Sequence, residues 1–291
     1  MLTESRPGPL DLLVVGGLTV DRFDDGSSVP GGSVIHVARA AAPRGVRLGI
    51  ATAAGPEAVA ALGVAELDRV AARLEVASRP ATATFRHREG DDRRRLWLER
   101  AGGDVALGPE ARDRFATRAV LFAPVATEIG ANALRAWDEA LPRGAILQGW
   151  LRAIAEDRAV TQLPLSRLDE TLRDLLGNLD LVVASREDLS AEADSPSDQL
   201  TALRALLGPK PVLVVTDGAD GLWLDLPGAG AGGEPHVHVP WRVEGVATVG
   251  AGDILAAFMT MGAKDPVGGW RVHVERAMRV VAEVLEERKG S

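Results

Sequence analysis

The chain has 291 residues, 46% of them hydrophobic and 25% charged, and it carries a net charge of −8 at pH 7. These values are typical of one large α/β domain or two small domains with a substantial core, and an acidic balance without a basic block argues against a nucleic-acid partner. No apolar stretch reaches the length of a membrane span, the amino-terminal residues lack the pattern of a signal peptide, and cysteine is absent, so we expect a cytoplasmic protein without disulfides or thiolate metal sites.

Short apolar runs alternate with amphipathic segments along the chain. The apolar runs predict strands over 11–17, 47–52, 119–123, 145–148, 179–184 and 211–216. The amphipathic segments predict helices over 34–44, 64–73, 131–140, 168–176 and 197–207. Continuous Val, Leu and Ile runs indicate strands that are covered on both faces, as in a parallel sheet. The alternation therefore predicts an α/β fold with a doubly wound, mainly parallel sheet flanked by helices.

Three segments depart from this alternation. Residues 21–30 are too polar and turn-rich for a core. Residues 81–87 and 94–98 alternate with period two on either side of a turn at 89–92, which predicts a β-hairpin with one wet face. We interpret the hairpin as a small β lid, and a hairpin without such a role is the alternative that the pattern leaves open. The glycine-rich stretch 228–233 is typical of a surface loop.

The motif most suggestive of chemistry is Thr-Val-Gly-Ala-Gly-Asp at 248–253, followed by the apolar run 254–259. Gly250 and Gly252 allow close approach to the backbone, and the first amides of a helix attract an anion such as phosphate. Asp253 beside such an end could accept a proton from an incoming hydroxyl. The motif indicates phosphoryl transfer, and the alternative is a plain turn with Asp253 as the helix N-cap.

Three other motifs precede this one: residues 13–21, which end in Asp21, residues 30–38, which contain Gly31 and Gly32, and residues 214–221. In this order the four motifs resemble those of the ribokinase-like carbohydrate kinases, also called the PfkB family. The resemblance covers most of the chain. It implies a ribokinase-like fold in a single domain over residues 1–291, with lid excursions near 21–33 and 80–100.

The resemblance also implies an ATP-dependent kinase that moves the γ-phosphate of ATP to a hydroxyl of a sugar, cyclitol or nucleoside. Asp253 would act as the general base. The implied anion hole consists of Gly250, Ala251 and Gly252, the acceptor site of Asp21, Gly31, Gly32 and His36, and the nucleotide site of Thr216, Gly218, Gly221 and Thr248. Plainer interpretations remain for three of these motifs: a surface turn at Asp21, strain relief at the two glycines after Pro30, and an ordinary hairpin turn at 216–221.

Several positions differ from the family pattern. Ala247 stands where members often carry an Asp that helps to build a monovalent-cation site, so potassium activation stays open. Ser185 and Asp188 stand in place of an Asn-x-x-Glu motif tied to Mg²⁺, and they could organise metal-bound water. His36 replaces an Asn that often meets the substrate, and residues 148–152 replace a segment that often contains Asp-Pro. These departures resemble a divergent branch whose acceptors include inositol-like polyols.

Two other classes of protein are alternatives to the carbohydrate kinase. The departures suggest, as an alternative, a catalytically weak or inactive kinase-fold binding or regulatory protein. A dinucleotide-dependent oxidoreductase ranks third, because the glycines near residue 16 lack the spacing of that fingerprint. His236 and His238 would share one face of a strand, but no third metal ligand is apparent, and we interpret His87 and His273 as packing residues. Lid strands often pair between subunits in this family, so we expect a monomer or a homodimer.

Overall fold

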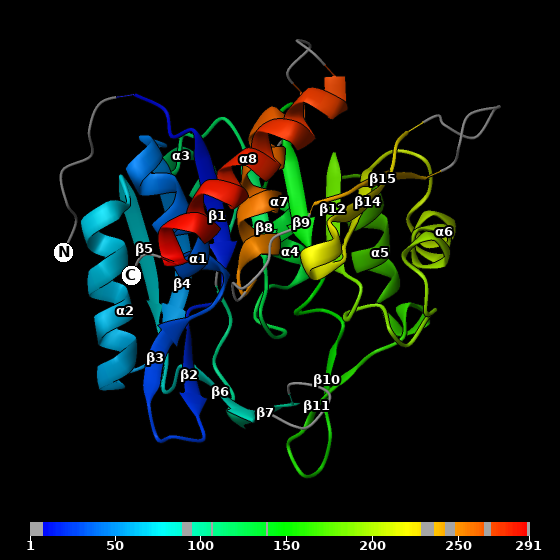
Figure 1. Cartoon of the computed structure of the whole chain (residues 1–291). Coiled ribbons are helices and arrows are strands. Elements are labelled where there is room, and N and C mark those ends of the chain that lie inside the picture. Colours follow the sequence, from blue (N-terminus) through cyan, green and yellow to red (C-terminus); the bar gives the residue numbers. More distant parts are fainter. Residues whose placement is uncertain are drawn as a thin grey trace.

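A nine-stranded sheet lies at the centre of the molecule (Figure 1). The computed structural model describes residues 8–88, 95–105, 107–137, 139–227, 236–241, 248–264 and 269–289. The order across the sheet is β15 (Val237–Val239), β14 (Leu222–Asp225), β13 (Val212–Thr216), β12 (Leu181–Ser185), β9 (Arg143–Ile146), β8 (Val120–Ala123), β1 (Leu12–Gly16), β4 (Leu48–Ala54) and β5 (Arg73–Ser78). Seven of these strands run parallel, and β14 and β15 run antiparallel at one edge.

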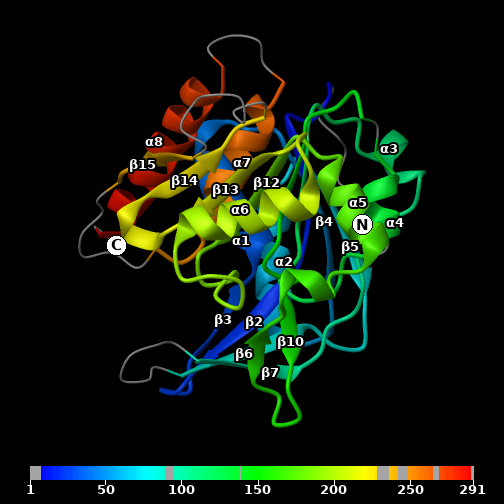
Figure 2. The same cartoon turned by 90° about the vertical axis from the view of Figure 1, so that its right-hand side faces the viewer.

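Helices cover both faces of this sheet (Figure 2). One face carries α1 (Ser33–Ala41), α2 (Ala58–Val70), α7 (Ala251–Gly262) and α8 (Gly269–Lys289), and the other carries α3 (Ala111–Arg114), α4 (Ala131–Arg135), α5 (Glu170–Gly177) and α6 (Pro196–Leu207). Alternate residues of β1 belong to the two cores, with Leu12 and Val14 in one and Leu13 and Val15 in the other. Because a strand points successive side chains to opposite faces, its continuous apolar run fills both cores.

A second, smaller sheet extends beyond the carboxyl ends of the parallel strands (Figure 1). Its order is β3 (Ser28–Gly31), β2 (Thr19–Phe23), β6 (Ala83–Arg88) and β7 (Arg95–Arg100). A separate hairpin, β10 (Arg152–Ile154) and β11 (Val160–Gln162), packs on its β7 edge, where the Leu98 amide donates to the Arg158 carbonyl at 2.9 Å. We call the four-stranded sheet the lid. The predicted turn at 89–92 and the predicted loop at 228–233 lie outside the described residues.

The fold class predicted from the sequence is confirmed, and the differences concern element boundaries. The helix predicted over 64–73 is α2, which begins at Ala58 and ends at Val70. Gly63 stands inside it, and a Cβ at this position would lie 2.9 Å from the Leu18 side chain, so a larger residue would require Leu18 to shift. The strand predicted over 145–148 is β9, which begins at Arg143. This buried arginine enters the sheet with its amide donating to Asp180 at 2.9 Å.

Two further helices end differently from the prediction. The helix predicted over 131–140 stops at Arg135. The helix predicted over 34–44 is α-helical to Ala41 and continues as the 3₁₀ turn η1 (Ala42–Arg44). Within the described part of the chain, no helix combines the length and apolar character needed to cross a bilayer.

Candidate active site

The predicted site residues gather at the carboxyl ends of the parallel strands. Asp21 lies in β2, the strand directly after β1, Ser185 ends β12 with Asp188 three residues later, and Thr216 ends β13. After β1 the chain builds β4 and β5 on one side and later adds β8 and β9 on the other, so the strand order reverses between β1 and β8. In open α/β sheets, ligands bind in the crevice at such a reversal.

Two helix N-termini meet here, and we call their meeting point the α1–α7 junction (residues 31–36 and 248–253). The helices α1 and α7 pack against each other, and each begins after a glycine N-cap with positive φ, 91° at Gly32 and 79° at Gly250. A Cβ at Gly32 would lie 2.2 Å from the Gly17 carbonyl oxygen, and one at Gly250 would lie 2.3 Å from the His36 ring. Both glycines are therefore required by conformation and by space.

The amino-terminal end of α7 presents free backbone donors. The Ala251 amide donates to the Thr248 carbonyl at 3.0 Å and the Ile254 amide to Gly250 at 3.1 Å. Among the described residues, the amides of Gly252 and Asp253 have no acceptor. The N-termini of α1 and α7 both carry partial positive charge. Because they meet at the α1–α7 junction, these charges add and favour binding of an anion there.

Asp253 lies in the first turn of α7 and faces this region. Burial raises the pKa of its carboxyl group, while His36, the hydroxyl of Ser33 and Arg152 lower it. Ser33 is buried at the start of α1, three residues before His36, so both lie on one face of the helix. A carboxylate with a raised pKa in a cleft has the character of a general base.

The His36 ring lies against the backbone of Gly250. Its Nδ1 is buried without a hydrogen-bond partner among the described residues. Burial lowers the pKa of His36, as do the cations Arg288 and Arg39, whereas Asp253 and Asp21 raise it. In the described part of the chain no carboxylate oxygen lies within ion-pair distance of this ring.

Asp21 is held by the lid and by the glycine before α1. The Thr19 hydroxyl donates to its Oδ1 at 3.0 Å, and a Cβ on Gly31 would lie 2.1 Å from its Oδ2. The structure therefore brings Asp21, Gly31, Gly32 and His36 together with Asp253, as the motif order predicts. The role assigned to each residue stays a prediction.

Arg152 is the main residue that the sequence reasoning missed. It begins β10, its Nη1 donates to the Val125 carbonyl, and its guanidinium lies over the Phe85 ring at 5.2 Å. Burial lowers its pKa, and Asp188, Glu128, Asp21 and Asp253 raise it in that order. No described carboxylate is close enough to form an ion pair with it. The only sequence signal was the unusual segment 148–152.

The predicted nucleotide residues lie at the turn after β13, residues 216–221, which we call the β13 turn. The Asp217 amide donates to the Gly221 carbonyl at 2.8 Å, and the Arg186 side chain pairs with Asp217 at 3.2 Å. A Cβ on Gly252 would lie 3.9 Å from the Thr216 hydroxyl oxygen, so this turn borders the α1–α7 junction. The turn also joins two antiparallel strands, β13 and β14, so the hairpin interpretation holds as a description of the backbone.

Ser185 and Asp188 satisfy one another. The Ser185 amide donates to Asp188 Oδ2 at 2.9 Å, and the Asp188 amide donates to the Ser185 hydroxyl at 3.1 Å. Asp188 is buried, and burial raises its pKa. Within the described ranges no group of three or more His, Cys, Asp or Glu side chains could hold a metal ion. The role predicted for Ser185 and Asp188, organising water bound to Mg²⁺, stays a prediction, and most ligands of such an ion would come from donor phosphates and water.

The remaining histidines are separated from one another. His236 contacts the Ser197 hydroxyl at 2.7 Å, and His238 contacts the Asp220 carbonyl at 3.1 Å and stacks on Trp223. His87 lies on the lid beside Asp21, so its interpretation as a packing residue is incomplete. Ala247 lies outside the described residues.

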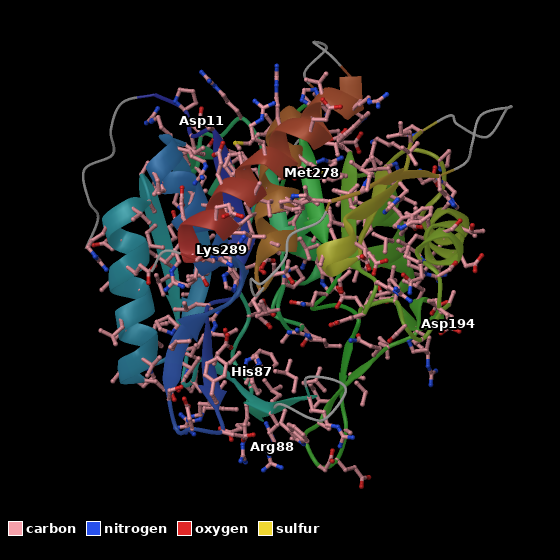
Figure 3. All side chains as sticks on the ribbon, in the orientation of Figure 1. Asp11, His87, Arg88, Asp194, Met278 and Lys289 are labelled. Carbon is pink, nitrogen blue, oxygen red and sulfur yellow. The ribbon has the colours of Figure 1, made fainter. Side chains whose placement is uncertain are left out.

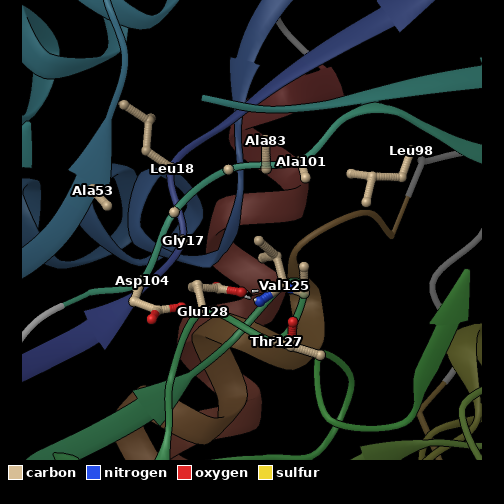
Figure 4. Close-up of a pocket in the computed structure, with 13 residues that line it drawn as sticks. Gly17, Leu18, Ala53, Ala83, Leu98, Ala101, Asp104, Val125, Thr127 and Glu128 are labelled. Carbon is tan, nitrogen blue, oxygen red and sulfur yellow. Dashed lines mark hydrogen bonds between the residues drawn. The ribbon is translucent and has the colours of Figure 1, made fainter. Parts of the chain in front are cut away.

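A pocket of about 500 Å³, its open mouth included, lies between the lid and the loop after β8 (Figure 4). Glu128 lines it, and each carboxylate oxygen accepts one backbone amide at 2.7 Å, from Val125 and from Ala126. Burial raises the pKa of Glu128. None of the described residues predicted for the site lines this pocket, but two of its lining residues, Gly17 and Val125, adjoin Gly32 and Arg152.

Comparisons with known proteins agree with this geometry. Residues 143–282 match the model of the pfkB family carbohydrate kinases. No curated protein sequence matches the chain significantly. A solved pyrophosphate-dependent myo-inositol-1 kinase, converted by two substitutions into a myo-inositol-3 kinase, is 18% identical with a TM-score of 0.73, over 94% of this chain and 92% of that chain.

Two other solved structures are similar to this chain. A pyrophosphate-dependent kinase in the ribokinase family, complexed with a pyrophosphate analogue and myo-inositol, is 17% identical with a TM-score of 0.70, over 93% of this chain and 92% of that chain. A probable sugar kinase from Rhizobium etli CFN 42 is 19% identical with a TM-score of 0.62, over 94% and 90%. The fold and the family match define the class, a ribokinase-like protein. Residues 143–282, just under half of the chain, match the pfkB family of carbohydrate kinases, and the whole chain shares the fold of the ribokinase-family kinases.

Proposed function

We propose that this protein transfers a phosphoryl group to a hydroxyl of a small, neutral, carbohydrate-like acceptor. The observation that carries the proposal is the α1–α7 junction, where unpaired helix amides lie next to Asp253. The reacting hydroxyl gives its proton to the Asp253 carboxylate as its oxygen attacks phosphorus, and the bond from phosphorus to the leaving phosphate breaks. Of the predicted anion hole at Gly250, Ala251 and Gly252, the Gly252 amide has no acceptor among the described residues and, with the Asp253 amide, stabilises the charge on the transferring group, whereas the Ala251 amide donates to the Thr248 carbonyl.

Arg152 supports this assignment through its unpaired charge. A largely buried guanidinium has five N–H donors, and one described hydrogen bond leaves most of them without a partner. Burial lowers the pKa of Arg152 and four carboxylates raise it, but none of them forms an ion pair with the guanidinium, so a phosphoryl group would accept charge-assisted hydrogen bonds from its free N–H donors. Arg152 would then help to hold the transferring phosphoryl group together with the helix amides.

The donor is proposed to be ATP, bound with Mg²⁺ along the β13 turn by Thr216, Gly218, Gly221 and Thr248. Mg²⁺ would neutralise phosphate charge when it is bound. Because two of the similar structures are described as pyrophosphate-dependent kinases, pyrophosphate is the second donor to test. We further propose a cytoplasmic enzyme that acts as a monomer or homodimer.

The acceptor is proposed to be uncharged. Asp21 and Asp253 both face the acceptor space, and an anionic acceptor would have to approach two carboxylates. A carboxylate suits paired O–H donors, as on a polyol. Sugars, cyclitols such as inositol, and nucleosides all meet this requirement.

A kinase-fold binding or regulatory protein is the second candidate. It is favoured by the closed Ser185–Asp188 pair, which leaves the described chain without a metal site of its own.

One screen distinguishes the two candidates. The purified protein is incubated with ATP or pyrophosphate, each with Mg²⁺, and with myo-inositol, D-ribose, D-glucose or adenosine, and phosphorylated product is detected by mass spectrometry. Acceptor-dependent product from the wild type and none from Asp253→Asn supports the kinase. Acceptor binding without product in any combination supports the regulatory candidate.

A further inference from the structure

The inner face of the lid carries a polar pair that the reaction described above does not use. In the lid, β2 and β6 run parallel with Asp21 opposite Phe85 and Phe23 opposite His87. Side chains of residues directly opposite each other on paired strands point to the same face of the sheet. Side chains two residues apart along one strand also share a face. Asp21, Phe23, Phe85 and His87 therefore share one face.

That face is directed at the acceptor space. Asp21 lies on it, and Arg152 from β10 packs over Phe85 at 5.2 Å. The next residue along β6, Arg88, stacks on Trp97 at 5.2 Å on the opposite face, with its side chain 48% exposed. Figure 3 shows His87 nearer the body of the molecule and Arg88 at its outer edge.

His87 lacks hydrogen bonds although it is nearly enclosed. Its side chain is 13% exposed and stacks on Phe23 with ring centroids 5.2 Å apart. Both ring nitrogens are buried without a hydrogen-bond partner among the described residues. Nε2 lies 3.3 Å from Asp21 Oδ1 but lacks the alignment of a hydrogen bond. Buried polar atoms in native structures are normally paired, so these nitrogens indicate a partner that arrives with a ligand.

We propose that His87 is a specificity-determining residue that binds acceptor hydroxyls together with Asp21. The carboxylate accepts O–H groups, and an imidazole can donate and accept, so the pair suits two neighbouring hydroxyls. Phe23 fixes the imidazole ring by stacking. The acceptor is then a ring polyol of the inositol or pyranose type, with vicinal hydroxyls on the edge that faces the lid, remote from the hydroxyl at Asp253.

This inference rests on the proposed kinase function, because it assigns the acceptor side of the same site. It goes beyond that function by naming a lid contact and a hydroxyl pattern. A nucleoside, whose base offers a flat heterocycle in place of a hydroxylated edge, would not use the Asp21–His87 pair.

The test compares His87→Phe, which keeps a ring against Phe23 and removes both nitrogens, with His238→Phe as the matched control. His238 is also a strand histidine stacked on an aromatic ring, with centroids 4.7 Å apart on Trp223, and it lies in β15. Loss of one or two hydrogen bonds should raise the acceptor KM by about 10-fold in His87→Phe. In His87→Phe the donor KM should not change and kcat should stay within about threefold, and His238→Phe, whose ring contacts the Asp220 carbonyl of the β13 turn, should keep the wild-type acceptor KM. Thermal unfolding of both variants checks that they fold.

Different results would contradict the role of His87 and the kinase activity. An unchanged acceptor KM in His87→Phe, with the wild type active, overturns the inference and leaves the kinase intact. If the wild type makes no product, the kinase proposal fails, and calorimetric binding of myo-inositol decides the inference alone. Binding that is about 10-fold weaker in His87→Phe than in the wild type supports it, and equal or absent binding overturns it.

Discussion

The α1–α7 junction and the β13 turn border the same site but differ in how their polar groups are paired. At the junction, Asp253 has a hydrogen bond with the Ser33 side chain but no ion-pair partner among the described residues, and Arg152 of β10 also lacks one. At the β13 turn, Arg186 already pairs with Asp217, and the Asp217 amide already bonds to Gly221. The charges at and near the junction are therefore not neutralised by an ion pair, whereas the charge of Asp217 at the turn is.

This difference predicts where substitutions should affect catalysis. A group without a protein partner contributes little to folding and is free to act on a ligand. A group that is already paired contributes to the local fold, and an exposed pair contributes little even there. Each of the following experiments pairs one residue from the junction or its surroundings with one from the turn.

The largest effect is expected for the carboxylates. Asp253→Asn removes the proposed base and should lower kcat by about 10²–10⁴-fold with little change in acceptor affinity. Asp217→Asn should change kcat by less than about threefold, because its charge is shared with an exposed arginine. Steady-state kinetics with the acceptor from the screen measures both, and equal losses would remove the distinction between the regions.

Arginines give the next comparison. Arg152→Gln should lower kcat/KM by about 10–100-fold, because a charge-assisted hydrogen bond contributes about 1.5–3 kcal/mol. Arg186→Gln should stay within about threefold, since Arg186 is half-exposed and paired with Asp217. Chemical denaturation of both variants shows whether a loss at Arg152 reflects unfolding, because this side chain also donates to Val125. A larger loss at Arg186 would place the phosphoryl contact at the turn.

Two glycines with positive φ test the backbone in the same way. At Gly218, where φ is 55°, a Cβ meets nothing within 4 Å, so Gly218→Ala should cost only the conformational strain of about 1 kcal/mol. At Gly250 the added Cβ also collides with the His36 ring, so Gly250→Ala should cost about 2–3 kcal/mol and reduce turnover. Urea unfolding gives both free energies, and similar costs would show that His36 moves aside freely.

The smallest effect is a change of stability with pH. Burial raises the folded-state pKa of Asp253 above its unfolded value, so ionising the group costs the folded state stability as pH rises between the two values. Asp253→Asn lacks this cost and should gain unfolding free energy relative to the wild type as pH rises from about 4 to 7. Asp217→Asn should show no such gain. A constant difference for Asp253→Asn would mean that this carboxyl is not destabilised by burial.

Patterns formed by residues that are close in sequence predicted much of the fold. Apolar runs such as the one in β1 predicted strands buried on both faces, and the period-two alternation predicted β6 and β7. The prediction placed the helix α2 at 64–73, whereas it spans Ala58–Val70 and includes Gly63, which packs close to the Leu18 side chain. The prediction also failed at the start of β9, where a buried arginine depends on Asp180.

Some residues of the candidate site were likewise predicted from a short motif, and others were missed. Glycine spacing and a following carboxylate predicted Asp253 and the start of α7 from one short motif. Arg152 and His87 were missed because nothing near them in the chain indicates their neighbours. Arg152 meets Phe85, 67 residues earlier, and His87 meets Asp21, 66 residues earlier, through pairing of strands within the lid and the packing of β10 over it.

The sequence by itself determined the α/β class, the lid hairpin and the helix start that carries Asp253, because hydrophobic period, turn residues and helix-capping glycines act over a few residues. Only the tertiary structure decided that two helix N-termini meet, that Ser185 and Asp188 bond to each other, that Arg152 packs over Phe85, and that His87 lies beside Asp21. The burial and the electrostatic surroundings of these side chains depend on segments that are far apart in the chain. Tertiary packing alone sets the distances between those segments.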